Sequence, residues 1–179
     1  MRARFNSNPM PEAAPGQKAE RAWRQFADRL PRRDSAPERV KNWFERLMTV
    51  LPEPNDDPED LGAKAAFVFG FDAEAARADP ANHAVLAADS ARVVLAELAE
   101  RARVHEGPVR PQEFEDWLNE IAAATGVRGE ELARPVQIAL TGACAGPDLG
   151  SIVLLLEDPA ARELGIPSVR DRIERFVGV

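Results

Sequence analysis

The stretch GVRGEELARPVQIALTGACAGP, residues 126–147, is the part of this 179-residue chain that decides its fold. Pro135 marks the expected start of a short helix, and Val136, Ala139 and Leu140 follow it at helical spacing. Gly142 is expected to end that helix, because glycine adopts the left-handed conformation of a helix stop without steric cost. Gly146-Pro147 then leads into another short helix. We interpret the stretch as a packing signature, with Ala139, Leu140 and Gly142 as its structural residues.

Helical patterns continue on both sides of this stretch. One expected helix is capped by Ser35, has Pro37 and Glu38 in its first turn and runs to Leu51. The other expected helices cover Lys18 to Leu30, Ala63 to Phe71, Ala81 to Val104, Pro111 to a stop at Gly126, and Ser168 to Val177. The composition agrees, because it has only 11 Gly, no Tyr and many strong helix formers. We therefore predict an all-α protein, with a flexible leader at 1–17 and two helical bundle subdomains at 18–106 and 107–179.

Several classes of protein are disfavoured by simple counts. The longest aliphatic run, Ile152 to Leu156, is far shorter than the roughly 20 residues of a membrane span. The single Cys144 with the isolated His83 and His105 does not make a zinc set, and neither histidine stands in a nucleophile pattern. We therefore expect no metal, no cofactor, no catalytic site and no membrane partner, and a cytoplasmic location.

Charge is distributed unevenly along the chain. The net charge is −7, which by itself disfavours a nucleic-acid partner. Residues 1–50, however, hold 11 of the 23 Lys and Arg and 6 of the 30 Asp and Glu, a balance of +5, whereas residues 51–179 hold 12 and 24, a balance of −12. The basic region is therefore a candidate RNA footprint, although basic N-terminal segments are often only solubilising.

Residues 126–147 resemble a recurring stretch of glutamyl-tRNA synthetases. In that family, a gly-leu/val-lys-x-gly-x-x-leu opening leads to pro-leu-arg-val-ala-leu-thr-gly and then to gly-pro, an order that Gly126 to Pro147 follows. Val169 to Ile173 resembles the closing val-x-x-arg-ile of the family, and Glu38 to Lys41 resembles its glu-arg-x-lys helix. The resemblance covers about residues 36–177. It implies the all-α anticodon-binding helical cage of class I aminoacyl-tRNA synthetases.

The chain also departs from the family pattern. Gln137 stands where the family has arginine, Ala143 stands where a basic residue often follows thr-gly, and an acidic connection, 157–168, replaces a short leu-leu-gly-lys link. The his-ile-gly-his motif is absent, since His83 and His105 are followed by other residues, and none of the three lysines lies in a lys-met-ser-lys-ser context. The resemblance therefore implies an anticodon-binding module without the catalytic half.

Three functions follow. The first is a free-standing module that binds the anticodon arm of tRNA for glutamate. The second is a synthetase subunit that takes part in aminoacylation only with a separate catalytic chain. The third is a protein-interaction module that kept the fold and lost RNA binding, which the acidic balance and the lost basic residues favour. If RNA binds, the candidate contacts are Arg39, Lys41 and Arg46 on one helix face, followed by Arg134 and Thr141, with Arg128 as a further possibility.

The missing nucleotide-binding motifs generate a prediction about catalysis. The purified chain is expected to support no glutamate-dependent exchange of pyrophosphate into ATP, because it lacks the groups that would hold ATP. The measurement is an exchange assay with radioactive pyrophosphate, and robust exchange by a pure sample would overturn the prediction.

Overall fold

The computed structural model describes residues 23–24, 26–51, 62 and 64–178, and within these it contains helices and no strand. The all-α prediction is confirmed. The elements with their bounds are the 3-10 helix η1 (Arg33–Ser35) and the α-helices α2 (Glu38–Val50), α4 (Ala66–Phe69), α5 (Ala73–Ala78), α6 (Pro80–Leu86), α7 (Asp89–Val104), α8 (Pro111–Thr125), α9 (Glu130–Thr141), α10 (Leu149–Leu156), α11 (Pro159–Glu163) and α12 (Val169–Val177).

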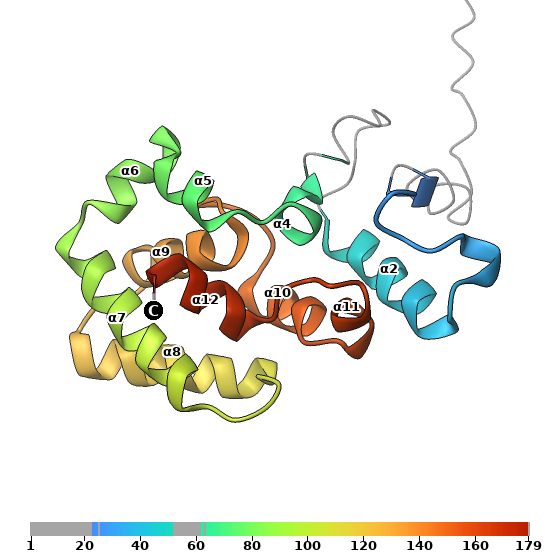
Figure 1. Ribbon diagram of the computed structural model, residues 1–179. Coiled ribbons are helices and arrows are strands. Elements are labelled where there is room, and N and C mark those ends of the chain that lie inside the picture. Colours follow the sequence, from blue (N-terminus) through green and yellow to red (C-terminus); the bar gives the residue numbers. More distant parts are fainter. Residues whose placement is uncertain (1–22, 25, 52–61, 63, 179) are drawn as a thin grey trace, which may run out of the picture.

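The helices form an elongated assembly with α2 at one end (Figure 1). The C-terminal α12 packs against α5, α7 and α9, while α8 packs against α7 and α10. At the other end, α10 and α11 both pack against α2. Buried apolar side chains from Trp23 to Ile173 make one main hydrophobic core. Contacts thus cross residue 106 in several places, and the division into subdomains 18–106 and 107–179 stays a prediction.

Several predicted helix ends are confirmed. Gly126 and Gly142 end α8 and α9 in the left-handed conformation, with φ of 76° and 85°. Ser168 caps α12, because its hydroxyl accepts the Asp171 N–H while the Asp171 carboxylate accepts the Ser168 N–H. Ala139 and Leu140 are fully buried, so the interpretation of this stretch as a packing signature is confirmed.

The single helix predicted over 81–104 is wrong, because the chain forms α6 and α7 with extended backbone at Ala88 between them. Asn82 is buried in α6, and its Nδ2 donates to the Ala76 and Gly142 carbonyls. In one straight helix, Asn82 would lie about 180° from Ala91 on the buried stripe of α7, since nine residues turn the helix by two and a half turns. The break allows both faces to be buried.

Two predicted helix starts are also wrong. Ser35 does not cap α2; its hydroxyl donates to the Arg32 carbonyl in η1, and Pro37 occupies the cap position. The reason is that proline disfavours helical backbone in the residue before it, and Ala36 is accordingly extended. Similarly, α9 begins at Glu130 and contains Pro135 in its second turn. The missing Pro135 N–H leaves only the Glu131 carbonyl without a helical donor, and Glu131 is exposed to water.

Some expectations fall on other parts of the chain. The leader 1–17, together with residues 18–22 and 25 of the helix expected over Lys18 to Leu30, lies outside the described residues, and residues 26–30 form a turn. Within the predicted segment Ala63 to Phe71 the structure places α4. The connection 157–168, for which no helix was predicted, contains α11.

A buried arginine joins three of these helices. Arg172 of α12 is fully buried, and its guanidinium donates to the carbonyls of Phe67 (2.6 Å), Val68 (3.2 Å) and Leu140 (2.6 Å), while Nε donates to the Pro167 carbonyl (3.1 Å). Three of the four acceptors, on Phe67, Val68 and Leu140, lie at the C-terminal ends of α4 and α9, where carbonyls lack helical donors and carry partial negative charge. Burial, with a smaller contribution from Arg175, lowers the pKa of Arg172 to about 9, so the group stays charged at neutral pH.

This arrangement predicts that Arg172→Met destabilises the fold by about 3 kcal/mol or more. Methionine fills much of the volume but leaves buried carbonyls at the ends of α4 and α9 without donors, and each costs about 1–3 kcal/mol. Urea unfolding monitored by circular dichroism measures the change. Arg175→Met, on the exposed side of the same helix, is the matched control and should change stability by less than about 0.5 kcal/mol. Equal effects of the two substitutions would contradict this role of Arg172.

Candidate nucleic-acid interface

The position of α2 follows from its apolar stripe. Val40, Trp43, Phe44 and Leu47 are buried, as the helical spacing predicts. The indole N–H of Trp43 also donates to the Leu155 carbonyl at 2.9 Å, which fixes α2 against α10. Because this side of the helix faces the core, the charged residues between the apolar positions are directed outward.

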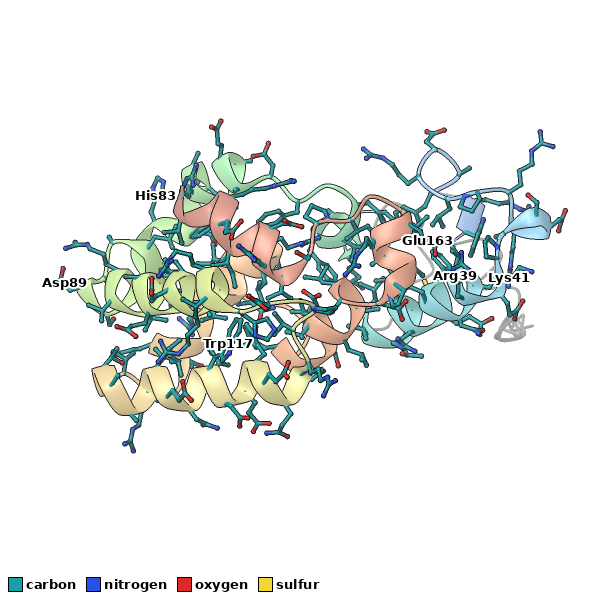
Figure 2. The ribbon with its side chains drawn as sticks, turned by 60° about the horizontal axis from the view of Figure 1, so that its bottom comes forward. Arg39, Lys41, His83, Asp89, Trp117 and Glu163 are labelled. Carbon is teal, nitrogen blue, oxygen red and sulfur yellow. The ribbon has the colours of Figure 1, made fainter. Side chains whose placement is uncertain are left out.

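The three basic candidates on α2 each have a carboxylate partner. The Arg39 side chain is 60% exposed and its Nε lies 2.6 Å from Glu163 (Figure 2), an interaction that raises the pKa of Arg39. Arg46 Nη1 donates to Asp158 Oδ2 at 2.8 Å. Lys41 is less exposed, and its Nζ lies 3.6 Å from Glu38 on the same helix. The three basic side chains on the outward side of α2 therefore all form ion pairs with carboxylates.

The partners of Arg39 and Arg46 both come from α11 and the residue that caps it. Ala160 and Ala161 are fully buried, which seats α11 in the core. Asp158 caps α11, since its Oδ1 accepts the Ala160 N–H while its Oδ2 faces Arg46. Glu163, at the other end of α11, is 40% exposed and faces Arg39. The acidic connection thus lies along the basic side of α2.

Glu157, at the start of this connection, holds the two ends of the connection together. Its Oε1 accepts the Val169 N–H at 2.9 Å, which ties the end of α10 to the start of α12. Burial raises the pKa of Glu157, and the backbone N–H groups of Val169 and Val109 oppose that rise. Residues 157–168 are therefore held at both ends as well as through α11.

The remaining candidates lie apart from α2. Arg134 is on α9, remote from α2 in Figure 1, and its Nη2 is 2.6 Å from Glu130 one turn earlier. Arg128 is exposed just before α9. Thr141 is buried; its hydroxyl donates to the Gln137 or Ala143 carbonyl and accepts the Ala143 N–H. The structure thus brings Arg39, Lys41 and Arg46 together on one helix and places Arg134 and Thr141 elsewhere.

Gln137 has a structural partner of its own. Its side-chain amide is buried and donates to the Pro147 carbonyl at 3.1 Å, closing the turn between α9 and α10. A Cβ on Gly146 would lie 2.8 Å from Gln137 Nε2, a distance that real contacts do not reach. Gly146 therefore allows the glutamine to close the turn.

Sequence reasoning missed Asp158 and Glu163 as part of this surface. The sequence shows that the connection 157–168 is acidic. It does not show that this connection contacts α2, because Arg46 and Asp158 are 112 positions apart. Helical periodicity reports which side of one helix is buried, and it carries no information about which distant segment covers the other side.

Two further observations concern the part of the chain that the structure describes. No helix there is long and apolar enough to cross a bilayer, and no three His, Cys, Asp or Glu side chains gather there as a metal site would require. His105 packs edge-on against Trp117, with ring centroids 5.2 Å apart.

Comparison with known families gives the class of protein that this helical assembly represents. The model of the anticodon binding domain matches residues 19–177, nearly the whole chain. The chain therefore belongs to the anticodon-binding domain family.

Comparison with curated proteins shows that the chain is similar to glutamate–tRNA ligases. Glutamate–tRNA ligase 2 of Alkalilimnicola ehrlichii is 30% identical over 152 residues, which cover 78% of this chain and 29% of the ligase. Glutamate–tRNA ligase 2 of Syntrophus aciditrophicus is 28% identical over 122 residues, covering 68% of this chain and 24% of the ligase. The expected resemblance is confirmed, and the chain spans only about a quarter of the length of these relatives. No solved structure matched the chain.

The double role of Asp158 generates a prediction about how α11 is held. Asp158→Asn keeps a capping oxygen and loses the ion pair with Arg46, so stability should fall by less than about 1 kcal/mol, the range of partly exposed pairs. Asp158→Ala loses both interactions and should cost about 1 kcal/mol more. Urea unfolding distinguishes the two, and an equal loss in both variants would show that capping by Asp158 contributes nothing.

Proposed function

We propose that this chain binds the anticodon arm of a glutamate-type tRNA and takes part in aminoacylation together with a separate catalytic chain. The observation that carries the proposal is the match of residues 19–177 to the anticodon binding domain. The relatives named above are glutamate–tRNA ligases, which supports glutamate-type tRNA as the ligand. A cytoplasmic location belongs to the same proposal, because tRNA aminoacylation is its setting.

The α2 surface supplies the chemistry for the proposed contact. Arg39 and Lys41 lie on a helix whose other side is fixed in the core, so they can meet phosphates without disturbing the fold. Arginine and lysine hold phosphates, while splayed loop bases are read by edges and stacking. Arg46 adds to the same surface, Arg134 is a second contact away from α2, and Thr141 contributes by ordering the turn after α9.

A protein-interaction module that has lost RNA binding is the competing function. It is favoured by one observation: Arg39, Lys41, Arg46 and Arg134 all have carboxylate partners in the structure. Exposed pairs of this kind are worth only about 0.2–1 kcal/mol, so a tRNA phosphate can replace the carboxylate. For this reason the paired state does not outweigh the family relationship.

The proposal predicts the effect of removing charge from α2. The double variant Arg39→Ala, Lys41→Ala should bind tRNA about tenfold more weakly, because two charge-assisted contacts to phosphate are lost. The dependence of log affinity on log salt should flatten by about 1.4 to 1.8, since each phosphate contact contributes about 0.7–0.9. Fluorescence anisotropy with labelled tRNA between about 50 and 200 mM salt measures both quantities.

The matched control is the double variant Arg92→Ala, Arg103→Ala. Both arginines are exposed on α7 and removing them changes net charge equally. Helicity should be unchanged in both double variants. Equal weakening by the two would contradict the placement of RNA on α2, and absence of binding by the unaltered chain to glutamate-type tRNA, alone or with a glutamate–tRNA ligase catalytic chain, would overturn the proposed function.

A further inference from the structure

We propose that α11 presents the Glu163 carboxylate as an internal competitor for RNA phosphate at Arg39, so that RNA must displace Glu163 to bind. The inference rests on the proposed function and concerns the regulation of the same surface. It starts from the contact in Figure 2, in which the side chains of Glu163 and Arg39 meet from two different elements.

The two ends of α11 differ in how firmly their carboxylates are held. Asp158 is 18% exposed and is used twice, by the Ala160 N–H as a cap and by Arg46 as an ion-pair partner. Glu163 is 40% exposed, and the ion pair that the structure shows for it is with Arg39. Asp158 therefore anchors the segment, while the Glu163 side chain can rotate into water without moving the backbone.

The backbone of α11 also stays in place when Glu163 leaves. Ala160 and Ala161 are fully buried under α11, and the Ile166 N–H donates to the Ala161 carbonyl just after the helix. A released Glu163 consequently remains close to Arg39 and returns when the phosphate leaves. A tethered carboxylate competes at high effective concentration, which lowers RNA affinity without removing the binding surface.

Most of the other ion pairs among the described residues form within a single helix. Lys41 with Glu38, Arg134 with Glu130 and Arg103 with Glu100 are pairs within one helical turn of the same element. Such pairs form on any exposed helix and stabilise it slightly. The Arg39 and Arg46 pairs instead join α2 to α11 and its cap residue. Asp158 is held in place by capping α11, so Glu163 is the partner that can rotate away from the proposed RNA surface.

The test is the affinity of Glu163→Gln for glutamate-type tRNA. Glutamine has nearly the same shape and lacks the charge, so Arg39 is released and affinity should rise about two- to fivefold, the range of exposed ion pairs. Glu100→Gln is the matched control, because it removes one negative charge from an equally short pair on α7 and releases Arg103. It should change affinity by less than half as much.

A second background separates release of Arg39 from general loss of repulsion. In Arg39→Ala, the substitution Glu163→Gln should have no more effect than Glu100→Gln. A gain that persists in Arg39→Ala, or equal gains in the two glutamine variants, would overturn the inference while leaving the proposed function standing. Absence of tRNA binding by the unaltered chain would overturn the proposed function and, with it, the inference.

Discussion

The structure depends on one buried positive charge. Arg172 lies fully inside the protein, and no carboxylate among the described residues pairs with it. Four backbone carbonyls surround its guanidinium, and its Cζ lies over the Phe71 ring, 4.6 Å from the ring centroid. A charge without water is tolerated only where polar groups converge, so the ends of α4 and α9 and the start of α12 must meet at this point. The termini of three helices are thereby fixed relative to one another.

A chain of contacts through the core connects α2 and α11 to the buried Arg172. Glu157 joins α10 to α12 beside it, Trp43 joins α10 to α2, and Ala160 with Ala161 seats α11 in the same core. The side chains of Arg39 and Glu163 are exposed, but the helices beneath them are rigidly supported. The positions of the charged side chains at this end of the molecule are therefore set by packed helices. Removing one charge, such as that of Glu163, consequently changes the electrostatic potential at a known position beside Arg39.

The sequence allowed prediction of the features that depend on near neighbours. The all-α class, the glycine stops at Gly126 and Gly142 and the start of the last helix near Ser168 all follow from rules that operate within a few residues. The errors occurred where distant contacts or backbone competition decide: the break before α7 depends on burial of Asn82 against α9, and Pro37 prevents Ser35 from capping α2. For the candidate surface, periodicity identified the exposed side of α2. The pairing with α11 could not be predicted, because it joins segments more than a hundred residues apart.

The closeness of Gly146 to Gln137 links two positions nine residues apart. A Cβ at 146 would lie 2.8 Å from the Gln137 amide nitrogen, so a side chain there requires the flexible end of the glutamine to swing away. The amide would then give up its hydrogen bond to the Pro147 carbonyl, which closes the turn after α9. Glycine at 146 and glutamine at 137 therefore work as a pair: the first leaves the space that the second fills.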